Sequence, residues 1–502
     1  MKPRPPPSLK PSPKHLRTLS RANSPSEGIG GKWVSELWPN HFQVDVVREA
    51  FGPRLAGYTI ALEAWRRGLR VRFFDSNLRK FEITDGKRKI KFDKSRPHLT
   101  TSEAVKIEQD KHLTSTYLSK AGVPVPNSWI IDPTAEDAEQ KLRHLVAEAG
   151  YPVVLKPLRG SMGRDVYTNL RTEEQLLETY RHLRENTAAP KLILEQHFTG
   201  EDYRVLVVGD RLVAACLRKP ANVTGDGTST IDELIKAKNA VRRNNPYLCK
   251  KPITPDREVH EYLAKQNYTL TSIPAEGIPV QLRGKANASQ GGDSIDKTAE
   301  IPAAVKDAAV RAVAAIPGLA IAGVDILYDA RRSPVEDSFR VIELNSRPEI
   351  EINMYPWEGS GQDAPQHILD VFFPDTRRSA DSGMEKLALD LEQLLAPLKG
   401  ASAEQVLVRK KPTHNYPVRS WYRHGLSSPL SADKRNRIYL AARQASVSGR
   451  IWAEGNSGYL ALFGTEDRVQ KFIRLADKHL HLDHSSAQHW TGVVTQGFRI
   501  DG

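Results

Sequence analysis

The alternation of hydrophobic and polar positions predicts a chain of mixed helices and strands from about residue 40 onward. An apolar, helix-like run, "GYTIALEAWRRG", ends at Gly68 and leads into the strand "LRVRFFD". "FEITDGKRKIKFD" alternates on both sides of Asp85-Gly86, which predicts a hairpin. A helix pair over 101–122 and a strand over 128–133 follow, and Thr134 is the expected N-cap of the next helix.

The same patterns continue to residue 375 and beyond. The strand-like run "YPVVLKPLRGSMGRDVYTNL" (151–170) enters a Gly-containing loop, and a helix over 172–187 precedes the strand "KLILEQHF". "YRVLVVGDRLVAACLRKP" predicts a hairpin that turns at Gly209-Asp210. An Ala/Val-rich helix (302–316) precedes the strands "LAIAGVDILYD" and "FRVIELNSRP". One helix is expected over 383–398.

A length of 502 residues predicts about three domains. Pro, Ser and basic residues dominate 1–30, so this tail is expected to be disordered. The expected units are a small N-terminal α/β domain over 31–105, a main α+β domain over 106–375, a linker over 376–402 and a C-terminal domain over 403–502.

The net charge of +13 is concentrated at the two ends of the chain. Residues 1–30 carry +5 and residues 401–502 carry +7, whereas the rest is nearly balanced. No nucleic-acid-binding signature accompanies this charge, so no specific nucleic-acid partner is expected. The sequence also has no membrane-spanning run and no signal-like apolar segment. With two cysteines a disulfide framework is excluded, which favours a reducing cytoplasm and a buried, inert Cys216.

Two neighbouring strands carry oxygen ligands near their ends. Asp325 lies in "GVDIL", and Glu343 and Asn345 alternate in "VIELNSRP", so the latter two project to one face. Such an all-oxygen set suits Mg²⁺, although buried strands whose polar residues only cap turns show the same pattern. Lys111 and Lys156 could contact phosphates as point charges.

Glycines and a carboxylate extend this candidate site. Gly160 and Gly163 would let backbone N–H groups approach phosphate oxygens, unless the loop is a plain turn. Glu195, near the end of an apolar strand, could pair with an adenine edge or could simply be a polar strand end.

The order of these residues resembles the ATP-grasp superfamily over about residues 100–375. "RKPANVTGDGTSTIDELIKAKN", "SIPAEGIPVQLRGKANASQGGDSIDKT", "AGVDIL" and "VIELNSRPEIEINMYPWEGSG" are similar to the ATP-grasp half of bifunctional glutamate–cysteine ligase/glutathione synthetases and to cyanophycin synthetases. The resemblance implies an ATP-grasp fold over 106–375, in which two α+β subdomains bind Mg-ATP between them. Residues 31–100 are too short for a glutamate–cysteine ligase domain.

The resemblance also implies a role for each candidate residue. ATP would be bound by Lys111, Lys156, a lid loop of Gly160, Ser161, Met162 and Gly163, Glu195 at the adenine, Asp202 at the ribose, and Arg204. Arg218, Lys285 and Asn287 would act at the transferred phosphate, and Asp325, Glu343 and Asn345 would hold two Mg²⁺ or Mn²⁺ ions.

The implied activity is ATP-dependent ligation of a carboxylate to an amine through an acyl-phosphate, with release of ADP and phosphate. Amino acids or small peptides are the expected substrates. The alternative is a nucleotide-binding regulatory or interaction protein whose core does not ligate.

The C-terminal segment raises a separate question. "IYLAARQASVSGRIWAEGNSGYLALFGTEDRVQKFIRLADKHL" resembles acylphosphatases, which implies a ferredoxin-like αβ sandwich. Arg435 stands near the position of that family's arginine, but Ala453 takes the position of its asparagine. We therefore expect a non-hydrolytic unit that helps to bind substrate or to form a homodimer, the alternative being a ligase that keeps acylphosphatase activity.

Overall fold

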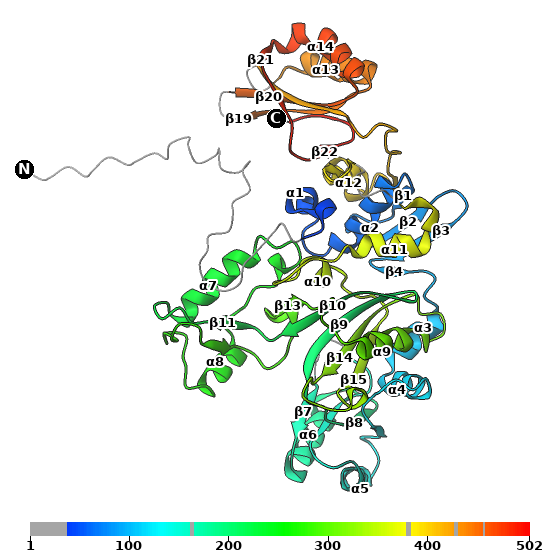
Figure 1. Cartoon of the computed structure of the whole chain (residues 1–502), viewed down its shortest axis with the longest axis vertical. Helices are drawn as coiled ribbons and strands as arrows, with labels where there is room; N and C mark the ends of the chain where they lie inside the picture. The colour runs from blue at the N-terminus through cyan, green and yellow to red at the C-terminus, as the bar shows by residue number, and fades with distance from the viewer. Residues whose placement is uncertain (1–37, 161–164, 378–382, 426–429, 455–456, 502) are drawn as a thin grey trace, which may run out of the picture.

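The computed structural model describes residues 38–160, 165–377, 383–425, 430–454 and 457–501. The predicted tail (1–30) and the loop residues Ser161, Met162 and Gly163 lie outside the described residues. Figure 1 shows four units: a C-terminal unit at one end, a small N-terminal sheet beside it, a central sheet, and a second small sheet at the other end.

The N-terminal unit is built around one apolar helix and a five-stranded sheet of order β17-β1-β2-β3-β4. Helix α2 is buried along its whole length and packs so closely that a Cβ atom at Gly57 would lie 1.9 Å from the Leu78 carbonyl oxygen. The predicted hairpin is confirmed by the antiparallel pairing of β2 and β3. Its elements are η4 (Asn40–Phe42), α1 (Val44–Val47), η5 (Arg48–Ala50), α2 (Leu55–Arg66), β1 (Arg70–Phe73), β2 (Lys80–Thr84), β3 (Lys89–Asp93), β4 (Arg96–Pro97) and β17 (Val406–Leu407).

Two sheets and the helices that pack on them make up the middle of the chain. Helices α5 and α6 cover a four-stranded sheet of order β5-β8-β6-β7. Helix α9 covers one face of a five-stranded sheet of order β13-β10-β9-β14-β15. The elements are α3 (Ser102–Gln109), α4 (Lys111–Lys120), β5 (Ser128–Ile131), α5 (Ala138–Ala149), β6 (Val153–Pro157), β7 (Tyr167–Leu170), α6 (Glu173–Asn186), β8 (Leu192–Gln196), β9 (Glu201–Val208), β10 (Arg211–Lys219), β13 (Asp293–Asp296), α9 (Ala303–Ala314), β14 (Ile321–Tyr328), η8 (Val335–Asp337) and β15 (Phe339–Asn345).

Residues 220–292 form a lobe between β10 and β13. This lobe has its own small apolar core and projects to one side of the central sheet in Figure 1. It contains β11 (Asn222–Thr224), α7 (Ile231–Arg242), η6 (Leu248–Lys250), α8 (Arg257–Ala264), β12 (Pro279–Gln281) and η7 (Ala288–Gln290). The chain after β15 forms α10 (Glu351–Met354), α11 (Ala364–Phe372) and η9 (Pro374–Thr376).

The C-terminal unit has the βαββαβ order of a ferredoxin-like sandwich. Its strands follow the order β21-β18-β20-β19-β23, and helices α13 and α14 pack on one face. The predicted αβ sandwich is thus seen directly, while the acylphosphatase resemblance itself stays a prediction. The elements are β18 (Val418–His424), α13 (Ala432–Ala445), β19 (Ser448–Glu454), β20 (Ser457–Gly464), α14 (Glu466–Leu480), β21 (Leu482–His489), β22 (Val494–Thr495) and β23 (Phe498–Ile500).

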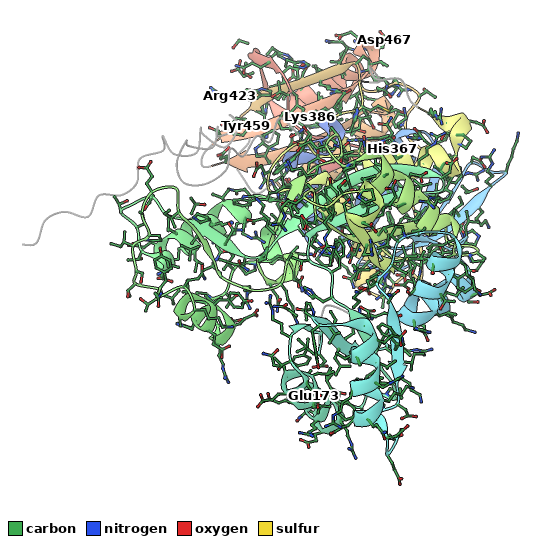
Figure 2. The ribbon with its side chains drawn as sticks, turned by 60° about the horizontal axis from the view of Figure 1, so that its bottom comes forward. Glu173, His367, Lys386, Arg423, Tyr459 and Asp467 are labelled. Carbon is green, nitrogen blue, oxygen red and sulfur yellow. The ribbon has the colours of Figure 1, made fainter. Side chains whose placement is uncertain are left out.

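The connection to the C-terminal unit is firmly attached on both sides. Its strand β16 (Leu387–Ala388) pairs with β22, and its helix α12 (Leu391–Lys399) buries Leu391 and Leu395. The Lys386 ammonium lies 2.5 Å from an Asp45 carboxylate oxygen of α1, and the Lys386 carbonyl accepts from the Val494 N–H. Figure 2 shows Lys386 beside the C-terminal unit, far from Glu173 of helix α6, which covers the small sheet.

Two local predictions are wrong. The helix after β5 begins at Ala138 with Asp137 at the N-cap, because the Thr134 hydroxyl donates instead to Asp132 in a tight turn. The helix expected over 383–398 begins only at Leu391, since Asp390 caps its first turn and the residues before it pair as a strand. Along the described part of the chain, every helix is too short or too polar to pass through a lipid bilayer.

Candidate active site

The small sheet presents a buried ion pair on the face that its helices leave open. Val153 and Leu155 of β6 point into the core under α5 and α6, so Lys156 points to the opposite face. Glu195 of β8 lies on that face too, one diagonal position away. The Lys156 ammonium and a Glu195 carboxylate oxygen are 2.6 Å apart, and both side chains are nearly buried.

Lys111 lies close to this pair at the start of α4. The Asp110 side chain caps α4 by accepting from the Leu113 N–H, which fixes where the helix begins. The Lys111 ammonium donates to the Gly160 carbonyl oxygen at 2.9 Å. Burial lowers the pKa of Lys111, against an opposing effect of nearby Glu343. Helix α4 packs against both β5 and β15, so it bridges the two sheets.

Charged side chains of the central sheet form two neighbouring rows that run across its strands. Asp202 and Arg204 alternate with buried Tyr203 and Val205 on β9, so both project away from the α9 side. Arg204 stands opposite Asp325, and Asp202 stands opposite Arg218.

Short ion pairs connect these four residues. The Arg204 Nε lies 2.7 Å and an Arg218 Nη2 lies 3.2 Å from the Asp325 oxygens, and Arg218 Nη2 is 2.5 Å from Asp202 Oδ1. Burial lowers the pKa of Arg218, but Asp325 and Asp202 raise it more, so the guanidinium stays charged.

Glu343 of β15 extends the row formed by Arg204 and Asp325, because it stands directly opposite Asp325. Among the described residues, the Glu343 carboxylate makes no hydrogen bond or ion pair, although it is partly buried. Burial and the neighbouring Asp325 raise its pKa, and Lys111, Arg204 and Lys156 partly counteract them. Asn345 lies two residues further on β15, where its side-chain oxygen accepts from the Arg347 N–H at 3.0 Å. The charges of Lys111 on α4, Lys156 on the small sheet and Arg204 on the central sheet thus all act on Glu343.

Lys285 and Asn287 belong to the loop that precedes β13. Asn287 caps η7, and its side chain accepts from Ser289. A Cβ atom at Gly292 would lie 2.8 Å from both the Asn287 and the Lys219 carbonyl oxygens, so this loop passes close to the end of β10. The loop that carries the two residues therefore passes next to Lys219, the neighbour of Arg218. Among the described residues, Asn287 makes no hydrogen bond to Asp325 or Glu343.

The donor set suits a cation and phosphates. The unpaired Glu343 carboxylate is partly buried and stands beside Asp325, whose buried Oδ1 accepts no well-aligned hydrogen bond from the described residues. Asp325, Glu343 and the Asn345 amide would supply hard oxygen ligands, and Lys111 and Lys156 would supply positive charge for phosphate oxygens. Within the described residues, no three Asp, Glu, His or Cys side chains form a metal cluster by themselves, so other ligands would have to come from the substrate or water.

Sequence reasoning missed a further carboxylate beside this site, that of Glu108. Glu108 of α3 accepts from the Ser346 hydroxyl at 3.3 Å, and burial raises its pKa. Glu108 lies three residues before Lys111 in the sequence, which was the available signal. The helix break at Asp110 places the two residues on different helices, α3 and α4, and so hides their proximity. The expected burial of Cys216 is confirmed: the residue is 1% exposed, and burial raises the pKa of its thiol to about 12.

A family model now adds to this geometry. The model of the RimK-like ATP-grasp domain matches residues 108–229, which include Lys111, Lys156, Glu195 and Arg218. The chain contains an ATP-grasp domain. The predicted fold class, ATP-grasp within a chain of mixed helices and sheets, is confirmed.

Known proteins are similar to longer parts of the chain. The cyanophycin synthetase of Synechocystis sp. is 35% identical over 274 residues, which are 54% of this chain and 31% of that protein. The glutathione biosynthesis bifunctional protein GshAB of Clostridium perfringens is 28% identical over 386 residues, 71% of this chain and 48% of that protein. A bifunctional glutathione synthetase structure from Pasteurella multocida aligns with a TM-score of 0.49 and 26% identity over 63% of this chain and 43% of that one. The chain thus spans about a third to a half of these curated relatives.

Proposed function

We propose that the protein is an ATP-dependent carboxylate–amine ligase. The observation that carries the proposal is the convergence of two lysines and an unpaired carboxylate between two sheets. Lys111 and Lys156 come from the small-sheet side, whereas Glu343 stands opposite Asp325 on the central sheet. Relatives named as a cyanophycin synthetase and as glutathione biosynthesis proteins support an amino acid or small peptide as substrate.

Each residue has a part in this proposal. Lys111, Lys156 and the Gly160 loop hold the ATP phosphates, while Glu195, Asp202 and Arg204 lie around the nucleoside. Asp325, Glu343 and Asn345 hold one or two Mg²⁺ or Mn²⁺ ions, which supply positive charge against the phosphate oxygens. Arg218, Lys285 and Asn287 stabilise charge on the phosphoryl group as it moves to the substrate carboxylate.

The chemistry balances without a side-chain nucleophile. A carboxylate oxygen of the first substrate attacks the γ-phosphorus, and the bond to ADP breaks. The amine of the second substrate then attacks the acyl carbon, phosphate leaves, and the amine loses a proton as the amide forms. The protein contributes positioning and fixed charges, which are effective in a site shielded from water.

The test measures ADP release and amide products from the full-length protein with Mg-ATP and a panel of amino acids and dipeptides. Glu343→Ala should lower turnover by about 100-fold or more, because charge stabilisation at the transferring phosphoryl is lost. Circular dichroism should show an unchanged fold. Glu336→Ala, at an exposed position in η8, is the matched control and should keep full activity.

Two results would contradict the proposal. One is the absence of substrate-stimulated ADP release across the whole panel, which would favour a nucleotide-binding protein with a non-ligating core. The other, a normal product yield from Glu343→Ala, would contradict the metal-binding role proposed for Glu343.

A further inference from the structure

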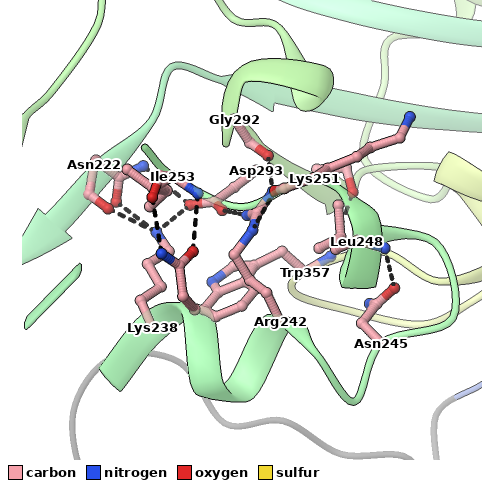
Figure 3. Close-up of polar contacts among 12 residues, drawn as sticks. Asn222, Lys238, Arg242, Asn245, Leu248, Lys251, Ile253, Gly292, Asp293 and Trp357 are labelled. Atoms are coloured by element: carbon pink, nitrogen blue, oxygen red, sulfur yellow. Dashed lines mark hydrogen bonds and ion pairs between the residues drawn. The ribbon is translucent and has the colours of Figure 1, made fainter. Parts of the chain in front are cut away.

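A buried polar cluster lies at the base of the lobe, behind the end of β10. We call it the Asp293 clamp; its members are Asn222, Lys238, Arg242 and Asp293. The Lys238 ammonium lies 2.6 Å from Asp293 Oδ2, and the Arg242 Nη1 lies 2.9 Å from Asp293 Oδ1. The Asn222 amide also donates to Asp293 Oδ2, at 3.0 Å. Figure 3 shows these side chains converging from α7, β11 and β13.

The clamp holds more positive than negative charge. Asp293 and Arg242 are 4% and 1% exposed, so the two cations and their one carboxylate are shielded from water. Burial lowers the pKa of Lys238 in spite of Asp293. The Trp357 ring faces both cations, at 4.8 Å from the Lys238 nitrogen. Because desolvating such charges offsets most of their attraction, stability alone is a weak explanation for this arrangement.

The hydrogen bonds of the clamp fix backbone segments from three parts of the chain. Arg242 donates to the Lys251 carbonyl at 2.8 and 3.0 Å and to the Gly292 carbonyl at 3.2 Å. Lys238 donates to the Asn222 carbonyl at 2.9 Å. Helix α7 therefore ties together the chain after β10, the segment at Lys251, and the chain before β13.

Two of these segments lead directly to residues of the proposed site. Asn222 follows Arg218 by four positions, and Arg218 pairs with Ser294, the neighbour of Asp293. On the other side, the Gly292 N–H donates to the Asn287 carbonyl at 3.0 Å, and the Asn287 N–H donates to the Lys285 carbonyl at 2.9 Å. A chain of hydrogen bonds thus runs from Arg242 through Gly292 to both Asn287 and Lys285.

We propose that Lys238, Arg242 and Asp293 are positioning residues that hold the loop 284–292 in register with the end of β10. This places Lys285 and Asn287 beside Arg218, so that all three face the same transferred phosphoryl group. The proposal rests on the ligase function above, because only a reaction at that point needs the three groups together. Lys111 on α4 and Lys156 and Glu195 on the small sheet, which bind the nucleotide in this proposal, make no hydrogen bond or ion pair with the clamp in the described part of the chain.

Two substitutions test the clamp in the full-length protein. Lys238→Met removes three donor contacts but leaves the Arg242–Asp293 pair neutral, so the fold should survive. Arg242→Lys keeps the charge but loses the fork that donates to two carbonyls. Lys236→Met is the control, since Lys236 lies on the same helix, is 73% exposed, and pairs with Asp232 rather than with a member of the clamp.

The first measurement is backbone hydrogen exchange of the loop. In Lys238→Met and Arg242→Lys, peptides covering 284–292 should exchange about tenfold faster or more than in the wild type, because the loop loses contacts that hold its backbone in place. Lys236→Met should match the wild type. Unchanged exchange in both clamp variants would overturn the proposal, whether or not the protein proves to be a ligase.

The second measurement separates positioning from general destabilisation. For ADP formation with the best substrate pair, kcat should fall about 10- to 100-fold in the clamp variants, since small displacements of catalytic groups are costly. The KM for ATP should stay within about twofold of the wild type. Faster loop exchange with an unchanged kcat would overturn the catalytic role of the clamp. A wild-type protein that turns over no substrate pair would contradict the proposed ligase function instead. The exchange data alone would then test whether the clamp holds the loop.

Discussion

The carboxyl group of Glu351 is buried between the N-terminal unit and the segment after β15. Its Oε1 accepts from the Ala56 N–H at 3.2 Å, in the first turn of α2, while its buried Oε2 has no hydrogen-bond partner among the described residues. Burial, together with the neighbouring Glu349, raises the pKa of Glu351 to about 7. The protonated form is therefore the one that the fold favours.

This shift gives the stability of the protein a defined pH dependence. A folded pKa of about 7 above an ordinary value of 4.5 means that the contribution is fully present below about pH 4.5 and is lost as the pH rises through 7. Glu351→Gln keeps an acceptor for Ala56 and cannot ionise. It should stabilise the protein by at most about 3 kcal/mol at pH 8.5 and have little effect at pH 5.

Thermal unfolding of Glu351→Gln and the wild type at pH 5 and pH 8.5 checks this expectation. Glu358→Gln, an exposed carboxylate nearby, should give the same melting temperature as the wild type at both values. An equal shift in Glu351→Gln at the two pH values would show that the ionisation of Glu351 is not responsible.

Sequence could predict Asp325 and Glu343 but not Glu351 or Asp293. The first two interrupt apolar strands with a period of two, so a single strand already shows which face they occupy. Glu351 is buried by a helix about 295 positions earlier in the chain, and Asp293 by cations that lie 51 and 55 positions earlier. No local pattern records such a contact. The roles of the predicted site residues themselves stay predictions.

Helix α7 shows how one well-capped element supports the clamp. Thr230 and Glu233 form a reciprocal capping box, in which Glu233 Oε2 accepts from the Thr230 N–H at 2.8 Å. The pKa of Glu233 is lowered by these hydrogen bonds from Thr230. The cap fixes the first turn of the helix that carries Lys238 and Arg242.

Removal of this cap should loosen the helix from its N-terminus. Thr230→Ala deletes the acceptor for the Glu233 N–H and should destabilise α7 by about 1 kcal/mol. Hydrogen exchange of amides in 231–242 should rise about fivefold as a result. Thr228→Ala, two residues earlier and outside the capping box, is the control. Equal exchange rates in α7 of the two variants would contradict a stabilising role of the box.

Most helices and strands between residues 55 and 345 could be predicted from hydrophobic periodicity, since each buries one clear face. The hairpins at Asp85-Gly86 and Gly209-Asp210 and the Ala/Val helix α9 are examples. Helix starts were less predictable, because several polar residues compete for the cap. The Thr134 hydroxyl donates to Asp132 instead of capping a helix, and Asp390 rather than an earlier residue is the N-cap of α12.

A single apolar core joins units that the sequence separates. The same cluster of buried residues contains Trp65 of α2, Leu206 of β9, Leu369 of α11, Leu391 of α12 and Phe463 of β20. The expected boundaries at 105, 375 and 402 stay predictions. Contacts such as β1 with β17 and β16 with β22 arise between distant segments, and no local composition signals them.

The C-terminal unit has the strand order of a ferredoxin-like sandwich but lacks a visible hydrolytic arrangement at the two expected positions. Arg435 lies in the first turn of α13, where its Nη2 donates to the Ile500 carbonyl at 3.2 Å. Ala453 of β19 stands opposite Gly458 of β20 and has no polar side-chain group. Arg435 thus has a structural contact with β23, and nothing at residue 453 could position a water molecule.

We therefore expect the full-length protein to hydrolyse benzoyl phosphate no faster than buffer when nucleotide is absent. Without an amide to orient the attacking water, a guanidinium alone should give no measurable rate, since such groups contribute orders of magnitude. Arg435→Ala should leave this background unchanged, and Arg437→Ala, an exposed neighbour paired with Asp433, is the control. Turnover well above the buffer rate that disappears in Arg435→Ala but persists in Arg437→Ala would show that the terminal unit is a hydrolase, and that the proposed ligase carries its own means of destroying acyl-phosphates.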